Sequence, residues 1–166
     1  MMGFIANLFA RSSPVLSDTT VADAAAIAAL HAACFRRGWS EQEVEGLLLD
    51  RNVIAHRAMV DGRLAGQVLA GFLMSRLAAD EAEILSVAVG AAWRGRGLAR
   101  RLLTLHLRRL AGLGVRAVFL EVGENNVPAI QLYTRAGFHE VSRRENYYRD
   151  AAGKASPALV LRRDLG

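Results

Sequence analysis

Hydrophobic and polar positions in the first third of the chain follow helical spacing. An alanine-rich run extends from Asp23 to Phe35, and alanine is the residue that most favours a helix. Further on, the segment from Ser40 to Glu43 has the Ser-x-x-Glu pattern of a capping box and precedes an apolar stretch toward Leu49. The pattern predicts two helices ahead of the first long strand.

Three extended runs come next. Residues 53–60 and 64–75 lie on either side of Asp61-Gly62, a dipeptide typical of a hairpin turn, and residues 82–89 form a third run. Because short connections join antiparallel strands, these segments are expected to form an antiparallel meander.

Helical spacing returns after Gly97, and residues 115–122 are then almost continuously apolar, as in a strand covered on both faces. Asn126 is expected to cap a helix that ends at Gly137, and a final strand pair at 138–143 and 158–161 closes the sheet. The fold class predicted from this order is α/β. The leucines expected on the buried side of the helix after Gly97 are Leu98, Leu102, Leu105 and Leu110.

Length and composition fit one folded domain. The chain has 166 residues, of which 52% are hydrophobic and 22% charged, a globular balance. We expect residues 15–166 to form a single domain and residues 1–14 to be an N-terminal extension that is flexible or loosely docked. The start of this extension is apolar, but it lacks the basic residues that precede the apolar run of a signal peptide. No apolar run is long enough to span a bilayer, so no membrane partner is expected.

Charge and cysteine content bear on partners and compartment. The formal net charge is +5 and Lys154 is the only lysine, so the basic surface is almost entirely arginine, which binds phosphate and carboxylate oxygens well. An anionic ligand or partner is expected, and charge alone does not separate a phosphate-bearing cofactor from a ribosomal or nucleic-acid partner. Cys34 is the only cysteine, which excludes an intrachain disulfide and favours a reducing cytoplasm. The histidines have no spacing suited to a shared metal, and His31 near Cys34 is interpreted as a packing residue.

The clearest chemical signal is the loop Arg94-Gly-Arg-Gly-Leu-Ala99, between a predicted strand and a predicted helix. Glycines let the backbone approach a ligand closely, and unpaired amides at a helix N-terminus bind anions such as pyrophosphate, although an ordinary strand-to-helix turn would look similar. A dinucleotide fingerprint would need a third glycine where this chain has Arg100, and a Walker loop would need Gly-Lys-Ser/Thr. Dinucleotide binding stays open as a minor alternative, because an acidic residue, Glu121, ends the next strand.

Two side chains in the second half are candidates for proton transfer. Glu121 shares a strand face with Ala117 and Phe119, so its carboxylate is expected at the edge of apolar surroundings, which would raise its affinity for a proton and suit a general base. An ion pair with an arginine is the alternative interpretation. Tyr133 lies among apolar residues at helical spacing, where an aromatic often serves as core, but a phenol with a pKa of about 10 can also donate to a thiolate leaving group.

These segments together resemble the Gcn5-related N-acetyltransferase (GNAT) family, whose pattern Gln/Arg-x-x-Gly-x-Gly/Ala is matched by Arg94, Gly97 and Ala99. The likeness covers about residues 19–165 and is greatest to the RimI type, which acetylates the N-terminal alanine of a ribosomal protein. In that type a proline typically precedes the tryptophan, where this chain has Gly38 before Trp39. The further matching segments are Leu85-Ser-Val-Ala-Val89, Leu120-Glu-Val122, Asn126-Val-Pro-Ala-Ile-Gln-Leu-Tyr133, Ala136-Gly-Phe138 and Asn146-Tyr-Tyr148.

The resemblance implies a splayed, mostly antiparallel mixed sheet of about seven strands flanked by about four helices. Acetyl-CoA would lie between the strands that end near Val89 and Glu121, with Glu121 as general base and Tyr133 as general acid. Whether Glu83 shares the base role stays open at the level of the sequence. The substrate side would include Trp39, Tyr147 and Tyr148. The coenzyme-binding residues implied are Val87, Val89, Arg94, Gly95, Arg96, Gly97, Leu98, Ala99 and Asn126.

The same resemblance implies a direct attack of a neutral amine on the thioester, without a metal. The expected substrate is the N-terminal alanine of a small-subunit ribosomal protein, bound by a monomer or weak dimer that needs no nucleic acid. The alternatives are a GNAT enzyme acting on a small-molecule amine or another protein, and a module that binds coenzyme A or RNA without chemistry.

Overall fold

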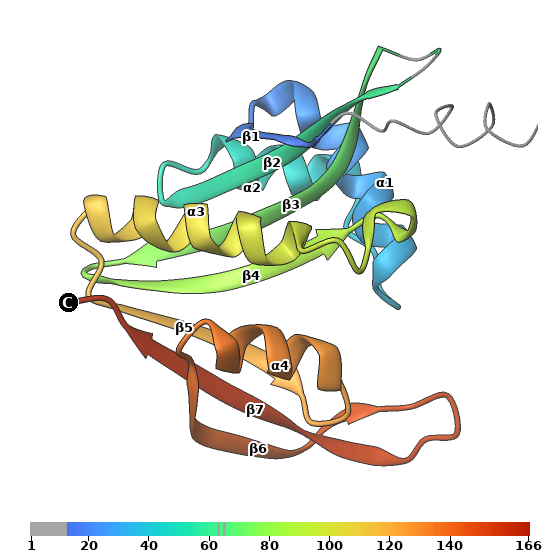
Figure 1. The fold of residues 1–166 in the computed structure, drawn as a ribbon. Coiled ribbons are helices and arrows are strands. Elements are labelled where there is room, and N and C mark those ends of the chain that lie inside the picture. The colour runs from blue at the N-terminus through green and yellow to red at the C-terminus, as the bar shows by residue number, and fades with distance from the viewer. Residues whose placement is uncertain (1–12, 63, 65) are drawn as a thin grey trace, which may run out of the picture.

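The computed structural model describes residues 13–62, 64 and 66–166. Nearly all of the N-terminal extension expected at residues 1–14 therefore lies outside the described residues. The rest of the chain forms one seven-stranded sheet with helices on both of its faces (Figure 1). This arrangement confirms the expected α/β fold with a mostly antiparallel sheet.

Two helices open the described chain, after a short strand and a turn of 3-10 helix. The second helix begins as expected, because the Ser40 Oγ accepts from the Glu43 amide at 3.1 Å and the Ser40 amide donates to the Glu43 carboxylate at 2.7 Å. The elements up to the first long strand are β1 (Val15–Asp18), η2 (Val21–Asp23), α1 (Ala24–Cys34), α2 (Glu41–Leu49) and β2 (Val53–Gly62).

The remaining elements follow the predicted order. The long helix α3 begins after Gly97, which has the left-handed φ of 75°, and α4 begins after Asn126, whose side chain accepts from the Ala129 amide at 3.3 Å. Their bounds are β3 (Gly66–Ala78), β4 (Glu81–Val89), η3 (Ala91–Trp93), α3 (Leu98–Gly112), β5 (Ala117–Gly123), α4 (Val127–Arg135), β6 (His139–Arg149) and β7 (Ala155–Asp164).

The sheet opens between its two central strands. Its order is β1-β2-β3-β4-β5-β7-β6, and all neighbouring pairs are antiparallel except β4 with β5. The parallel pair joins only three residues of each strand and ends where Glu83 lies beside Phe119. Beyond that point β4 and β5 diverge, and Figure 1 shows the part with β5, β6, β7 and α4 spreading away from the part with β1 to β4.

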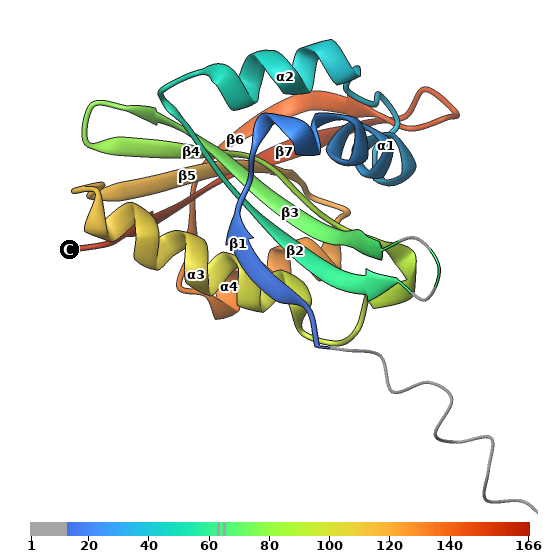
Figure 2. The same ribbon diagram turned by 90° about the horizontal axis from the view of Figure 1, so that it is seen from above.

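The helices lie in two layers. Helices α1 and α2 cover one face of the sheet and α3 and α4 the other (Figure 2). The apolar core is divided in the same way, into a cluster with Ile27, Val44, Phe72 and Met74 under α1 and α2, and a larger cluster centred on α3. The sheet thus separates two apolar clusters, one on each of its faces.

Several local expectations were wrong. Asp61 and Gly62 do not form the turn between β2 and β3, because they still pair with Gln67 and Gly66 as part of the two strands. Leu105 is only half-buried, and α3 instead buries Leu103, His106 and Leu107 beside the expected leucines. Strands β6 and β7 are longer than expected, because they pair with each other over most of their length, and β1 was not expected at all.

Candidate active site

A cleft of about 1880 Å³ lies where β4 and β5 diverge. It is lined by the second half of β4, the loop into α3, one side of α3, the end of β5, and α4, with Tyr148 of β6 at its edge. It therefore reaches from the N-terminus of α3 to the candidate proton-transfer residues on β5 and α4.

The loop before α3 presents free amides to this cleft. Gly95 and Gly97 have φ of 72° and 75°, a left-handed conformation that other residues rarely adopt. Within the described part of the chain, no hydrogen bond uses the amides of Leu98, Ala99 or Arg100, as is usual for the first turn of a helix. Three adjacent donors at the positive end of a helix dipole can bind a phosphate group.

Arg94 fixes the loop to its surroundings. Its Nε donates to the Val89 carbonyl at 3.0 Å, and its Nη2 lies 3.3 Å from the Cys34 Sγ. These contacts tie the loop to the end of β4 and to α1. The guanidinium of Arg96 instead lies 5.6 Å from the Trp93 ring centroid, and Arg96 does not line the cleft.

Glu121 lies on the cleft in a charged setting. Its Oε1 accepts from Nη1 of Arg144 on β6 at 2.8 Å, and its side chain is 28% exposed. The ion pair with an arginine, the alternative interpretation from the sequence, is thus present. The pair fixes the orientation of the carboxylate and leaves its second oxygen, which makes no hydrogen bond to the described residues, free to accept a proton.

Tyr133 lies inside the cleft on α4. The residue is buried, and its ring meets Phe138 edge to face with centroids 5.6 Å apart. Burial raises the pKa of the Tyr133 phenol to about 12, so the hydroxyl stays protonated at neutral pH. It can donate a hydrogen bond to a developing thiolate without losing its proton.

The two tyrosines of β6 are placed differently. Tyr148 lines the cleft and its ring packs over Gly123, where an added Cβ would meet it at 3.5 Å. Burial raises the pKa of Tyr148. Tyr147 does not line the cleft, because neighbouring strand residues point in different directions, and the Arg144 guanidinium lies 4.9 Å from its ring centroid instead.

Most of the candidate residues from the sequence meet at the cleft, but not all. Trp39 is not on its lining, because its indole stacks on the His31 ring with centroids 4.0 Å apart. His31 is buried, accepts from the Trp39 amide and has its pKa lowered by burial, which confirms its packing role. Glu83 is exposed and also absent from the lining. The candidates that line the cleft are Val87, Val89, Arg94, Gly95, Gly97, Leu98, Ala99, Glu121, Asn126, Tyr133 and Tyr148.

The sequence did not single out three residues at this site. Arg144 comes from an edge strand and reaches Glu121 only through the β5-β7-β6 pairing. Cys34 and Phe35, at the end of α1, also line the cleft, and Cys34 is in contact with Arg94 of the loop into α3. No local pattern signals these positions, because the pairing of distant segments places them there.

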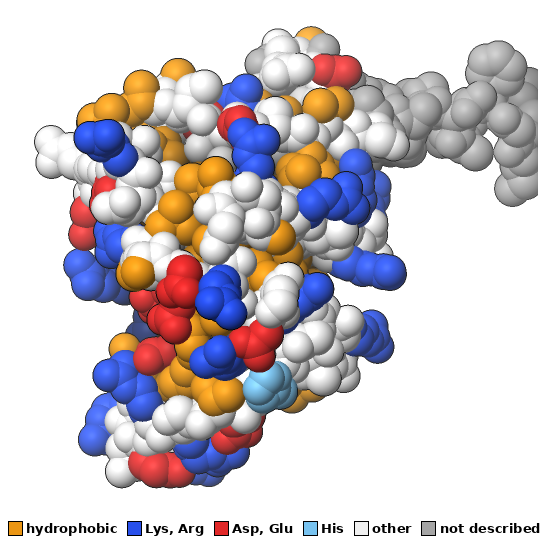
Figure 3. All heavy atoms as spheres, turned by 90° about the vertical axis from the view of Figure 1, so that its left-hand side faces the viewer, with side chains coloured by type: hydrophobic (Ala, Val, Ile, Leu, Met, Phe, Trp, Pro, Cys, Tyr) orange, Lys and Arg blue, Asp and Glu red, His pale blue; other side chains and the backbone are white. Residues whose placement is uncertain are grey.

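The basic residues do not gather into one surface on the end of the molecule where α3 terminates. There, Lys and Arg side chains alternate with Asp and Glu, with apolar side chains between them (Figure 3). Ion pairs neutralise individual arginines elsewhere in the sheet as well, as between Arg162 and Asp164 of β7 and between Arg143 of β6 and Glu124 after β5. Among residues 13–62, 64 and 66–166, no group of three or more His, Cys, Asp or Glu side chains is arranged to hold a metal ion, and no helix is long and apolar enough to cross a membrane.

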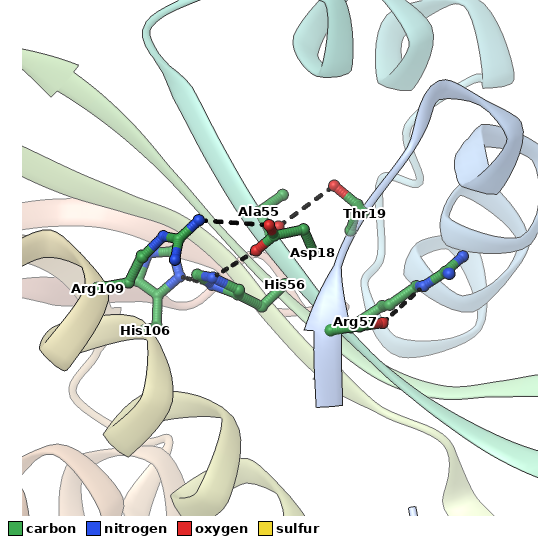
Figure 4. A network of polar contacts seen from close by, with 8 residues as sticks. Asp18, Thr19, Ala55, His56, Arg57, His106 and Arg109 are labelled. Carbon is green, nitrogen blue, oxygen red and sulfur yellow. Dashed lines mark hydrogen bonds and ion pairs between the residues drawn. The ribbon is translucent and has the colours of Figure 1, made fainter. Parts of the chain in front are cut away.

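A second titratable cluster lies away from the cleft, between α3 and β1 to β3 (Figure 4). His56 Nε2 lies 3.2 Å from Asp18 Oδ1, His56 Nδ1 is 2.7 Å from His106 Nδ1, and His106 Nε2 is 2.6 Å from the Ser75 Oγ. Since the carboxylate only accepts, one pattern satisfies every atom: Ser75 donates to His106, His106 to His56, and His56 to Asp18. Both imidazoles are then neutral, and Arg109 lies 3.4 Å from the other Asp18 oxygen.

Known proteins share this fold and its sequence pattern. A model of the Acetyltransferase (GNAT) family matches residues 24–138. The [ribosomal protein bS18]-alanine N-acetyltransferase of Salmonella typhimurium is 39% identical over 92 residues, which are 55% of this chain and 62% of that protein. The chain thus spans less than two thirds of the length of this relative.

Solved structures are also similar. The crystal structure of the ribosomal-protein-S18-alanine N-acetyltransferase from Escherichia coli has a TM-score of 0.81 at 25% identity, covering 92% of this chain and 94% of that one. Arabidopsis thaliana NAA60 in complex with acetyl-CoA has a TM-score of 0.80 at 20% identity, covering 92% and 99%, a likeness of fold alone.

Proposed function

Since the chain belongs to the acetyltransferase (GNAT) family, we propose that it transfers the acetyl group of acetyl-CoA to the α-amine of a protein that begins with alanine, a small-subunit ribosomal protein in the first instance. One observation carries the proposal: a single cleft joins the free amides at the α3 N-terminus to Glu121 and Tyr133. The name of the relative from Salmonella typhimurium supports the choice of substrate.

The cleft fits the parts of the coenzyme in order. The pyrophosphate would bind the amides from Arg94 to Ala99, whose glycines leave room for close approach. Beyond Glu83, β4 has no strand partner on its β5 side, so the main chain near Val87 would bind the amide groups of the pantetheine arm there. The Val89 carbonyl already accepts from Arg94, so Val89 would bind the arm beside that contact. Asn126, at the start of α4, would bound the coenzyme on the opposite side of the cleft.

The chemistry requires one base and one hydrogen-bond donor. The amine nitrogen attacks the thioester carbon, the C–S bond breaks, and the amine proton passes to Glu121 directly or through a water. Tyr133 donates a hydrogen bond to the departing sulfur. With its pKa at about 12 against about 8.5 for a thiol, Tyr133 stabilises the thiolate without full proton transfer.

An α-amine suits such a modest base. Its pKa is about 7.7 to 8.0, compared with about 10.4 for a lysine side chain, so a useful fraction is already neutral near pH 7. A carboxylate held by Arg144 at 2.8 Å then needs to remove a proton only as the new bond forms. This favours an N-terminal substrate over a lysine.

A pair of matched substitutions tests the base. Glu121 and Glu124 each accept from a neighbouring arginine of β6 at 2.8 Å, but only Glu121 lines the cleft. We expect Glu121→Gln to lower kcat on a peptide beginning with alanine by roughly 10²-fold or more, with the affinity for acetyl-CoA by calorimetry nearly unchanged. Glu124→Gln should leave kcat unchanged. Equal rates for the Glu121→Gln variant and the wild type would refute the role of Glu121.

A further inference from the structure

Ser86 of β4 has an unsatisfied hydroxyl at the cleft. Among the described residues, its Oγ is the one buried side-chain oxygen or nitrogen without a hydrogen-bond partner. The residue is 6% exposed and lines the cleft. An unpaired buried hydroxyl destabilises a fold, since it loses its hydrogen bonds to water without replacement. Such a group suggests a partner that binds from outside.

A second serine in the neighbouring strand shows the contrast. Ser75 of β3 is fully buried as well, but its Oγ lies 2.6 Å from the His106 Nε2. The two hydroxyls therefore have the same chemistry and similar burial, and only the one on the cleft lacks a partner.

The strand register shows which face of the sheet Ser86 occupies. Ser86 pairs with Met74, and Ile84 pairs with Ser75. Leu85 between them has no partner of its own on β3, so β4 contains a β-bulge at this point. Directly paired residues of antiparallel strands share a face. Met74 packs in the core under α1 and α2, so Ser86 lies on that face.

Ser75 lies on the opposite face of the sheet, since its hydroxyl is hydrogen-bonded to His106 of α3. The free amides that would hold the coenzyme pyrophosphate begin α3, on that same face. The Ser86 side chain therefore lies on the face of the sheet opposite to α3, at a point where β4 no longer pairs with β5.

We propose that Ser86 binds the acceptor substrate: its Oγ hydrogen-bonds the incoming N-terminal residue, on the face of the sheet opposite to α3. This inference rests on the proposed function, because it places the amine and the coenzyme on the two faces of one cleft. A hydroxyl both donates and accepts, so it can accept from the α-amine or donate to the first peptide carbonyl. Either bond helps to orient the amine toward the thioester.

The matched serines provide the test. We expect Ser86→Ala to raise KM for a peptide beginning with alanine roughly fivefold to tenfold, as for one lost hydrogen bond, with KM for acetyl-CoA unchanged. Its urea midpoint should equal or exceed that of the wild type, because no native bond is lost. Ser75→Ala should lower the urea midpoint and leave the peptide KM unchanged. An unchanged peptide KM in Ser86→Ala, or a urea midpoint lowered as in Ser75→Ala, would overturn the inference.

A bisubstrate analogue, a peptide beginning with alanine joined to coenzyme A, separates this inference from the proposed function. In calorimetry the wild type should bind the analogue more tightly than it binds coenzyme A alone. The affinity of Ser86→Ala for the analogue should be roughly fivefold to tenfold lower than that of the wild type, while its affinity for coenzyme A is unchanged. If the wild type gains nothing from the peptide part, the proposed function fails. If Ser86→Ala keeps the full gain, only the role of Ser86 fails.

Discussion

Acid should destabilise this protein through its buried histidine pair. Burial lowers the pKa of His106 from 6.5 to about 3, and the proximity of His56 adds to the effect. Protonation of either ring would place two N–H groups against each other, or would reverse the Ser75 hydrogen bond. The groups that face the pair are Asp18, Arg109 and Ser75, and Asp18 with Arg109 has no net charge to offset an added proton.

The sign and size follow from the two pKa values. Between pH 6.5 and about 3 the unfolded chain binds a proton at His106 that the folded chain does not, so stability is fully present above pH 6.5 and decreases as the pH falls. Each pH unit in this window contributes about 1.4 kcal/mol, so the free energy of unfolding should decrease by roughly 2 kcal/mol between pH 7 and pH 5. Burial also lowers the pKa of His56 and of His31, which acts in the same direction.

Urea denaturation at pH 7 and pH 5 measures this change. The wild type should lose about 2 kcal/mol or more, and His106→Asn should be less stable at pH 7 but depend less on pH. His139 is exposed on β6, so His139→Asn should keep the wild-type dependence. A wild-type free energy that is the same at both pH values, or an undiminished decrease in His106→Asn, would refute the argument.

Two further substitutions probe the cleft. Tyr133→Phe keeps the packed ring but removes the donor, so kcat should fall roughly 10²-fold with KM for acetyl-CoA little changed; an unchanged kcat in steady-state assays would exclude the hydroxyl from catalysis. Gly97→Ala puts a Cβ on a residue with φ of 75°, which should cost about 1–2 kcal/mol in thermal unfolding and weaken acetyl-CoA binding in calorimetry. Gly46→Ala is the matched control, because Gly46 lies in the middle of α2 with nothing near its Cβ position, and it should instead stabilise the fold by about 0.5–1 kcal/mol. Equal affinities of the two glycine variants for acetyl-CoA would argue against pyrophosphate binding at Gly97.

Features encoded by neighbouring residues were predictable. The Ser40 capping box, the Asn126 cap and the glycines before α3 act within a few residues of themselves, so their patterns identified the helix starts and the glycine loop that precedes α3. The same local glycine pattern could not show that Arg96 turns to the Trp93 ring, because that contact depends on how the loop closes.

Features made by distant pairing were not predictable. Strand β1 has only four residues and is held by its pairing with β2, about forty positions later in the chain. His56 meets His106 across 50 positions, and Glu121 meets Arg144 across 23. The β-bulge that places the Ser86 side chain on the face opposite to α3 arises from the pairing register of β3 with β4. These contacts depend on the assembled sheet, which no local pattern specifies.

The most direct test of the proposed activity compares two peptides incubated with the enzyme and acetyl-CoA. One begins with a free alanine, and the other has the same sequence with a blocked N-terminus and an internal lysine. Fragmentation by mass spectrometry locates any acetyl group that is added. We predict acetylation of the free α-amine and none of the lysine; equal modification of the lysine peptide, or no acetylation of either peptide, would contradict the proposal.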